Sequence, residues 1–125
     1  MSALASEAVA DKHWRWLPGM LDTDGRRVLS VRERIAPLEG SWLNGVDLGG
    51  STVTGRLAHA KLPDLDDAAT LGCLLALVRE AWGRDVFVEH HGDGLWRVHQ
   101  AHREYVIGVG RLEAAALVAA LLGAP

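Results

Sequence analysis

The sequence predicts an α+β fold: one compact domain with a β-rich N-terminal half followed by an α-β-β-β-α unit with an antiparallel sheet. Three observations predict this fold. Glycines separate short apolar runs over residues 13–60, which is typical of strands joined by turns. Two runs with helical spacing of apolar residues lie within residues 64–123, and three strand-like runs separate them. A chain of 125 residues buries roughly two-thirds of its unfolded surface, so we expect a single domain over 1–125.

The N-terminal half begins with a segment for which the sequence allows two conformations. Residues 1–12 form either a short helix opened by Ser2 or a flexible arm, because their apolar side chains recur at poor helical spacing. Further along, Asp24 and Gly25 separate two apolar runs and predict a hairpin turn, since both residue types tolerate positive φ angles. The strands expected in this half lie at 16–21, at 26–33, around Trp42 and at 52–57.

A helix is predicted from about Asp66 to Trp82, because five large apolar residues recur there at helical spacing. Asp64 or Asp66 is expected to accept the free amide hydrogens of its first turn, and Gly83 is expected to end it. The five residues are Leu71, Leu74, Leu75, Val78 and Trp82.

A second helix is predicted from Arg111 to Leu122, and its sequence is almost wholly apolar. One face packed against a sheet would leave the opposite apolar face exposed. Either the N-terminal half covers that face, or a partner does. A homo-oligomer formed through this helix is therefore one of the expected assemblies.

A hairpin within Val88 to Glu104 decides where four of the six histidines lie. If residues 92–94 form a three-residue loop with glycine in the left-handed conformation, Val88 lies opposite Val98. Glu89 and Arg97 then face each other on the outer side of the sheet as a favourable charge pair. The expected buried face comprises Val86, Val88, Trp96 and Val98.

The same register predicts that the histidines are dispersed. His91 and His99 lie four residue steps apart on the outer face, on the order of 13 Å at about 3.3 Å per step. Ligands of one zinc ion each lie about 2 Å from it, so we expect these two histidines to share no metal. His99 and His102 flank the next turn and remain as a weak candidate pair without a third ligand. We expect solvent-facing histidines, with no bound metal and no cofactor.

Other motifs do not favour catalysis. The single cysteine, Cys73, lies in an apolar helical run, which indicates a core residue and excludes an intrachain disulfide. The stretch "GVDLGGST", Gly45 to Thr52, resembles the phosphate loop of actin-like and sugar-kinase ATPases, but this chain lacks the length of those two-domain folds. No G-x-S-x-G or H-E-x-x-H motif occurs. We therefore expect a protein that is not an enzyme.

Tryptophan and arginine side chains provide the expected binding surface, because indole and guanidinium groups dominate the energetics of protein interfaces. The leading expectation is a small non-enzymatic protein that binds a protein partner. The residues expected to make this contact are Trp14, Trp16, Arg26, Arg32, Arg34 and Trp42.

Two alternative functions stay open. A nucleic-acid-binding protein would use the strand from Arg26 to Arg34, whose alternation places Arg26, Arg32 and Arg34 on one face, although a net charge of −3 weighs against it. The other alternative is a small histidine-dependent enzyme or metal-binding protein. No apolar run approaches the roughly 18 to 20 residues of a bilayer span and no secretory signal is evident, so we expect no membrane association.

Three patches of the sequence carry a resemblance: "WRWLPGML", "LPDLDDAATLGCLLALVREAW" and "EAAALVAALLGAP". They resemble a group of small uncharacterised proteins carried by bacteriophages and prophages. The resemblance covers about half of the chain and carries over no catalytic or binding residue. It implies a context, namely a protein in the cytoplasm of a bacterial host that binds, and in doing so blocks, a host factor.

Overall fold

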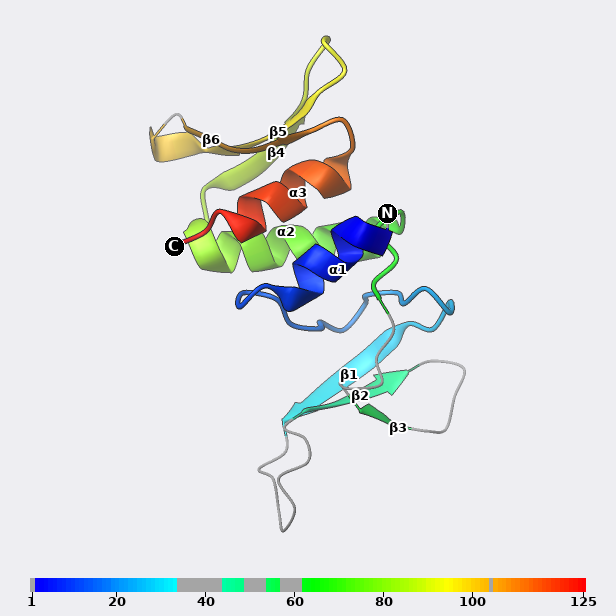
Figure 1. The fold of residues 1–125 in the computed structure, drawn as a ribbon. Coiled ribbons are helices and arrows are strands. Elements are labelled where there is room, and N and C mark those ends of the chain that lie inside the picture. Colours follow the sequence, from blue (N-terminus) through cyan, green and yellow to red (C-terminus); the bar gives the residue numbers. More distant parts are fainter. Residues whose placement is uncertain (1, 34–43, 49–53, 57–61, 104) are drawn as a thin grey trace.

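The computed structural model describes residues 2–33, 44–48, 54–56, 62–103 and 105–125 (Figure 1). The described part contains helices and two three-stranded antiparallel sheets, which confirms the α+β class. Its sheets have the strand orders β1-β2-β3 and β4-β5-β6. The elements in chain order are α1 (Ser2–Ala10), β1 (Val28–Glu33), β2 (Asn44–Leu48), β3 (Thr54–Arg56), α2 (Ala68–Trp82), β4 (Val86–His90), β5 (Trp96–Gln100), the 3₁₀ turn η2 (Ala101–Arg103), β6 (Tyr105–Gly110) and α3 (Glu113–Leu122).

Helix α2 lies where the sequence predicts it, but another aspartate caps it. Asp67 precedes the helix in an extended conformation and accepts a hydrogen bond from the Thr70 amide at 2.9 Å. Asp64 instead accepts from the Asp66 amide at 3.0 Å, which closes the turn before the helix. The expectation that Asp64 or Asp66 caps the helix is therefore wrong. Gly83 ends the helix as expected, with φ 124° and a 2.8 Å bond from its amide to the Arg79 carbonyl.

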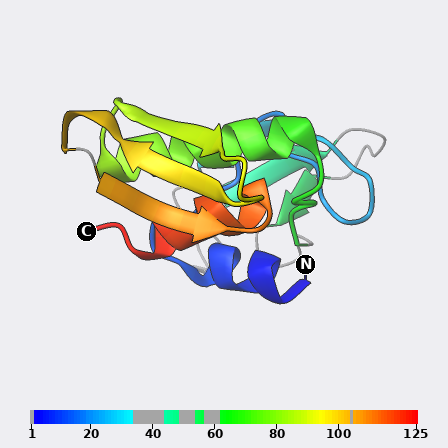
Figure 2. The same ribbon diagram turned by 90° about the horizontal axis from the view of Figure 1, so that it is seen from above.

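Helix α3 is the most deeply buried element of the described structure. It packs against β5 and β6 on one side and against α2 and α1 on the other, which buries most of its apolar residues but leaves Leu122 exposed (Figures 1 and 2). Two glycines of β6 permit the close approach of α3 to the sheet. A Cβ atom added to Gly108 would overlap the Ala116 carbonyl oxygen, and one added to Gly110 would lie 2.7 Å from the Ala115 Cβ. The homo-oligomer expected through this helix stays a prediction, because Leu112 and Leu122 at its ends are exposed.

The expected β-rich N-terminal half is not supported as a whole. Of the two structures that fit residues 1–12, the helix is the one observed, with Ala5 and Ala8 buried. Residues 16–21, all of them described, form no strand beyond one isolated bridge, from Leu21 to Arg27. Pro18 and Gly19 turn the chain there, because Gly19 adopts φ 100° and the Met20 amide donates to the Leu17 carbonyl at 3.2 Å.

The rest of that half agrees in part with the expectation. Asp24 and Gly25 form the predicted turn, with Gly25 at φ 81° and its amide 3.1 Å from the Asp22 carbonyl. Strand β1 lies within the predicted 26–33 segment and β3 within 52–57. Trp42 lies outside the described residues.

The second sheet has the register that the sequence predicts. Val86 lies opposite Gln100 and Val88 opposite Val98, and Gly94 adopts φ 80° in the connecting loop. Val86 and Val98 are buried against the helices. A register shift between Val98 and His99 then alters the pairing with β6. None of the helices in the described ranges combines the length and the apolar composition that a membrane crossing requires.

Candidate metal centre on the open sheet face

Sheet β4-β5-β6 has one covered face and one open face. Helix α3 packs against the first, and no described element covers the second (Figures 1 and 2). Phe87, Val106 and Val109 are accordingly exposed, with 39%, 46% and 46% of their surface accessible. An antiparallel sheet can face water on one side, but that side is normally polar. The open face is thus the first place to look for function.

Three side chains converge on this face, from the hairpin of β4 and β5. Glu89 Oε2 lies 2.9 Å from His91 Nε2 and 3.1 Å from His99 Nε2. The three atoms all lie within 4.8 Å of one another. In the described part of the chain this is the one group of three metal-ligating side chains so close together.

The convergence corrects the expectation that His91 and His99 are too far apart to share an ion. That expectation used the backbone spacing, on the order of 13 Å, and ignored the length of the side chains. Glu89 lies between the two histidines along the face, and both imidazoles reach toward it. Their ring centroids are only 6.0 Å apart.

The strand register explains how each group is held. Phe87 lies directly opposite His99, and their rings stack with centroids 4.9 Å apart and planes 14° apart. This stacking fixes the plane of the His99 imidazole. His91 is positioned by the end of the hairpin, where its amide donates to the Leu95 carbonyl at 3.0 Å.

Arg97 lies opposite Glu89 in register, as predicted, but its ion pair is made elsewhere. The guanidinium donates to Asp93 in the loop, with Nη2 2.6 Å from Oδ2. Arg97, together with the Leu95 amide, lowers the pKa of Asp93 to about 2. Because Arg97 is engaged in this way, the Glu89 carboxylate faces the two imidazoles.

The local chemistry suits a cation better than it suits hydrogen bonding. The Nε2 atoms of His91 and His99 are shielded from water, yet neither makes a hydrogen bond to any described group. Both are nevertheless within ion-pair distance of the same carboxylate oxygen. In a tetrahedral zinc shell with bonds of about 2.1 Å, neighbouring ligand atoms lie about 3.4 Å apart. The two distances from Glu89 Oε2, 2.9 and 3.1 Å, lie close to that spacing.

The other histidine candidates do not join this cluster. The His102 imidazole pairs with the Asp85 carboxylate, which also accepts from the His102 amide at 3.0 Å, and His102 is not a member of the three-residue group. His90 lies opposite Trp96, and the two rings stack with centroids 4.4 Å apart. His90 therefore belongs to the same hairpin but to its other face.

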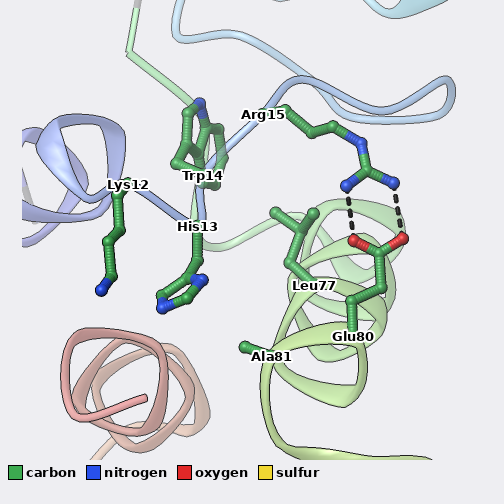
Figure 3. A pocket seen from close by; sticks show the side chains of 7 residues that line it. All are labelled: Lys12, His13, Trp14, Arg15, Leu77, Glu80 and Ala81. Atoms are coloured by element: carbon green, nitrogen blue, oxygen red, sulfur yellow. Dashed lines mark hydrogen bonds and ion pairs between the residues drawn. The ribbon is translucent and has the colours of Figure 1, made fainter. Parts of the chain in front are cut away.

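Of the tryptophan and arginine surface expected from the sequence, the structure describes the side chains of Trp14, Trp16 and Arg26. Trp16 is a core residue with 3% of its surface exposed, whereas Trp14 is half-buried beside a pocket (Figure 3). Arg26 is exposed in the turn before β1. Arg34 and Trp42 lie outside the described residues.

The single arginine face predicted for residues 26–34 stays a prediction, because Arg34 lies outside the described residues. A register shift between Val28 and Ser30 places Val28 opposite Leu48 and Ser30 opposite Asp47. Arg32 lies in β1 opposite Gly45.

Sequence reasoning missed Glu89 and His91 as candidate ligands, although the signal was present. The correct register already placed Glu89 on the same face as both histidines. Side chains in a strand lean along it, so residues two apart on one face touch when both are long.

Comparison with known proteins adds nothing to this picture: the chain matches no family model, no curated protein and no solved structure.

Proposed function

We propose that the protein binds a divalent metal ion of the zinc type through Glu89, His91 and His99. The observation that carries the proposal is the convergence of one carboxylate oxygen and two imidazole nitrogens within 4.8 Å. Imidazole nitrogen and carboxylate oxygen are a donor set that suits zinc and its first-row neighbours. The function proposed is binding, not catalysis.

A metal ion accounts for the two nitrogens better than an ion pair does. Partly exposed ion pairs contribute only about 0 to 1 kcal/mol, and these two contacts lack the geometry of a hydrogen bond. A buried polar atom without a partner costs about 1 to 3 kcal/mol. One cation would satisfy both nitrogens and the carboxylate together. Three ligands from this chain leave a fourth coordination position on the open face.

Isothermal titration of the metal-free protein with Zn²⁺ tests the proposal. We expect one ion per chain, and we expect His91→Ala and His99→Ala each to weaken binding at least about tenfold, since loss of a ligand costs no less than loss of its supporting partner. Glu89→Gln should weaken binding too, because the neutral amide is a poorer ligand.

His90→Ala is the matched control. It removes an imidazole from the same hairpin, one residue away from a proposed ligand, but on the face where it stacks against Trp96. It should leave the affinity for Zn²⁺ unchanged. Absence of stoichiometric binding, or equal weakening in His90→Ala and His91→Ala, would contradict the proposal.

A second candidate function rests on the exposed apolar residues of the same face, namely Phe87, Val106 and Val109. Apolar side chains gathered on an uncovered sheet face are typical of a contact with another protein. This is the protein-binding function expected from the sequence, now assigned to a different surface. The face carries both Glu89 and Arg97, so a second copy of this chain meets no net repulsion there. We take that second copy as the partner to test.

Sedimentation at several protein concentrations tests this second candidate. We expect self-association that Val109→Lys abolishes, because a charge would be buried in the contact. Val9→Lys, on the exposed side of α1, is the matched control and should associate as the wild type does. A protein that stays monomeric at every concentration would exclude the second copy as the partner.

A further inference from the structure

Arg97 is placed to pair with either of two carboxylates of the same hairpin. It lies opposite Glu89 in the register of β4 and β5, and residues directly opposite each other on one face of such a pair have Cβ atoms about 4.5 to 5.5 Å apart. Asp93, in the loop that joins the two strands, precedes Arg97 by four positions. Only 23% of the Arg97 side chain is exposed, so its charge is poorly hydrated and needs a carboxylate partner.

Arg97 binds Asp93 in the structure. Its Nη2 donates to Oδ2 at 2.6 Å and its Nη1 donates to Oδ1 at 3.3 Å, so both oxygens of the carboxylate are engaged. Oδ1 also accepts from the Leu95 amide at 3.0 Å, which fixes the carboxylate within the loop. Because Arg97 and this amide lower the pKa of Asp93 to about 2, Asp93 is fully charged at neutral pH and balances the charge of Arg97.

A guanidinium beside Glu89 would compete with a metal ion in two ways. It would donate to the carboxylate oxygens, which are the atoms that a metal ion needs as ligands. It would also place a positive charge next to the ion, and the two would repel each other. Asp93 chiefly, and Glu89 in addition, raise the pKa of Arg97, so both carboxylates lie within electrostatic range of the guanidinium. Asp93 is the one that Arg97 binds.

We propose that Asp93 is a positioning residue of the metal centre: by holding Arg97, it keeps the Glu89 carboxylate free to bind the ion. This inference rests on the proposed binding of a metal ion by Glu89, His91 and His99. Asp93 supplies no ligand, because it is not a member of that three-residue group. It acts through Arg97 alone.

Isothermal titration of metal-free Asp93→Asn and Arg97→Met with Zn²⁺ tests the proposal. Asparagine keeps an oxygen that can accept from the Leu95 amide, but it loses the charge that holds Arg97. We expect Asp93→Asn to weaken zinc binding about fivefold, which corresponds to the upper end of the range for one partly exposed ion pair. Arg97→Met should bind zinc at least as tightly as the wild type, because the competing cation is gone.

The double variant, which carries Asp93→Asn and Arg97→Met together, separates an effect through Arg97 from any other role of Asp93. We expect it to bind zinc as tightly as Arg97→Met does, because without the guanidinium the charge of Asp93 has nothing to hold. A structural role in the loop, or a direct attraction between Asp93 and the ion, would leave the double variant as weak as Asp93→Asn.

Glu80→Gln is the matched control. It breaks another exposed pair of an arginine and a carboxylate, between Arg15 and α2, and it should leave the affinity for zinc unchanged. A wild type that binds no zinc would overturn both this inference and the proposed function. Wild-type binding that Asp93→Asn leaves unchanged, or a double variant no tighter than Asp93→Asn, would overturn the role of Asp93 alone.

Discussion

At the scale of single residues, Asp67 joins two parts of the chain that are far apart in sequence. Its carboxylate accepts from the Thr70 amide at 2.9 Å and also binds the Arg27 guanidinium, with Nη1 2.9 Å from Oδ2. The same Arg27 nitrogen donates to the Gly19 carbonyl at 2.7 Å. Thr70 Oγ1 accepts in turn from the Leu21 amide at 2.9 Å. One side chain therefore caps α2 and fastens the turn before β1 to it.

Arg27 is the main reason that the pKa of Asp67 falls from its usual value near 3.8 to about 2, and hydrogen bonds from Thr70 add to the effect. The unfolded chain therefore takes up a proton at a higher pH than the folded chain does. Lowering the pH from about 4 to about 2 consequently removes stability that is fully present at neutral pH.

Asp67→Asn keeps a capping oxygen but removes the charge. We expect it to lower the free energy of unfolding at pH 7 by about 0.5 to 2 kcal/mol, and we expect its difference from the wild type to shrink as the pH falls from about 4 to about 2. Urea unfolding at several pH values measures both effects. Asp24→Asn, at an exposed turn position, should stay within about 0.5 kcal/mol of the wild type. A constant difference at every pH would show that the charge of Asp67 has no role.

The sequence alone could not select Asp67 as the cap. Asp64, Asp66 and Asp67 all precede the apolar run, and each residue type can accept amide hydrogens. The choice depends on Arg27, which lies 40 positions earlier and reaches the helix only in the folded chain. Local pattern predicts that a cap exists, and tertiary contact decides which residue provides it.

At the scale of elements, the contact between β6 and α3 depends on small residues on both sides. Gly108 and Gly110 face a helix whose nearest residues include Ala115, Ala116 and Ala120. A side chain at either glycine would push the helix away from the sheet. The signal was present in the sequence, since two glycines spaced two apart in a strand face one side and the following helix is rich in alanine.

Gly108→Ala should destabilise the fold by about 1 to 3 kcal/mol, as expected when atoms are forced into a filled core. Its Cβ would overlap the Ala116 carbonyl oxygen and lie 2.8 Å from the Ala120 amide nitrogen. Gly92→Ala is the matched control, because a Cβ there meets nothing within 4 Å, and it should change stability by less than about 0.5 kcal/mol. Thermal unfolding of both variants measures this difference in stability. Equal stability of the two variants would refute the close packing of α3 on β6.

The elements that the sequence predicted correctly are those with a strong local pattern. Helices α2 and α3 and the hairpin of β4 and β5 follow from apolar spacing and from a glycine at a fixed turn position. The strand expected at 16–21 failed because Pro18 and Gly19 form a turn inside an apolar run. Trp16 and Met20 are buried there without belonging to a strand. Apolar content alone does not distinguish such a buried turn from a strand.

At the scale of the whole molecule, burial of α3 determines which surface is free. Sheet β4-β5-β6 covers this helix on one side, and α1 and α2 cover it on the other (Figure 1). Most of the apolar residues of this helix are thereby buried within the chain, with Leu122 left exposed. The outer face of the sheet keeps the apolar side chains of Phe87, Val106 and Val109 exposed to solvent, and the proposed metal centre lies on the same face.

The sequence predicts the strand register of the candidate site, but it does not predict that the three side chains meet. The sequence places Glu89, His91 and His99 on one face, yet backbone spacing suggests that the histidines are separate. Their convergence depends on side-chain rotamers and on the stacking of His99 against Phe87. It also depends on the ion pair that Arg97 forms with Asp93 in place of Glu89. These contacts form only in the folded hairpin, so they cannot be predicted from the spacing of residues in the sequence.

The most direct measurement of the central claim is an anomalous difference map at the zinc absorption edge, from crystals grown with Zn²⁺. The account predicts one strong peak on the open face of the sheet, about 2.0 to 2.2 Å from Glu89 Oε2, His91 Nε2 and His99 Nε2. A peak at His102 and Asp85 instead, or no peak at the three side chains under saturating zinc, would contradict it.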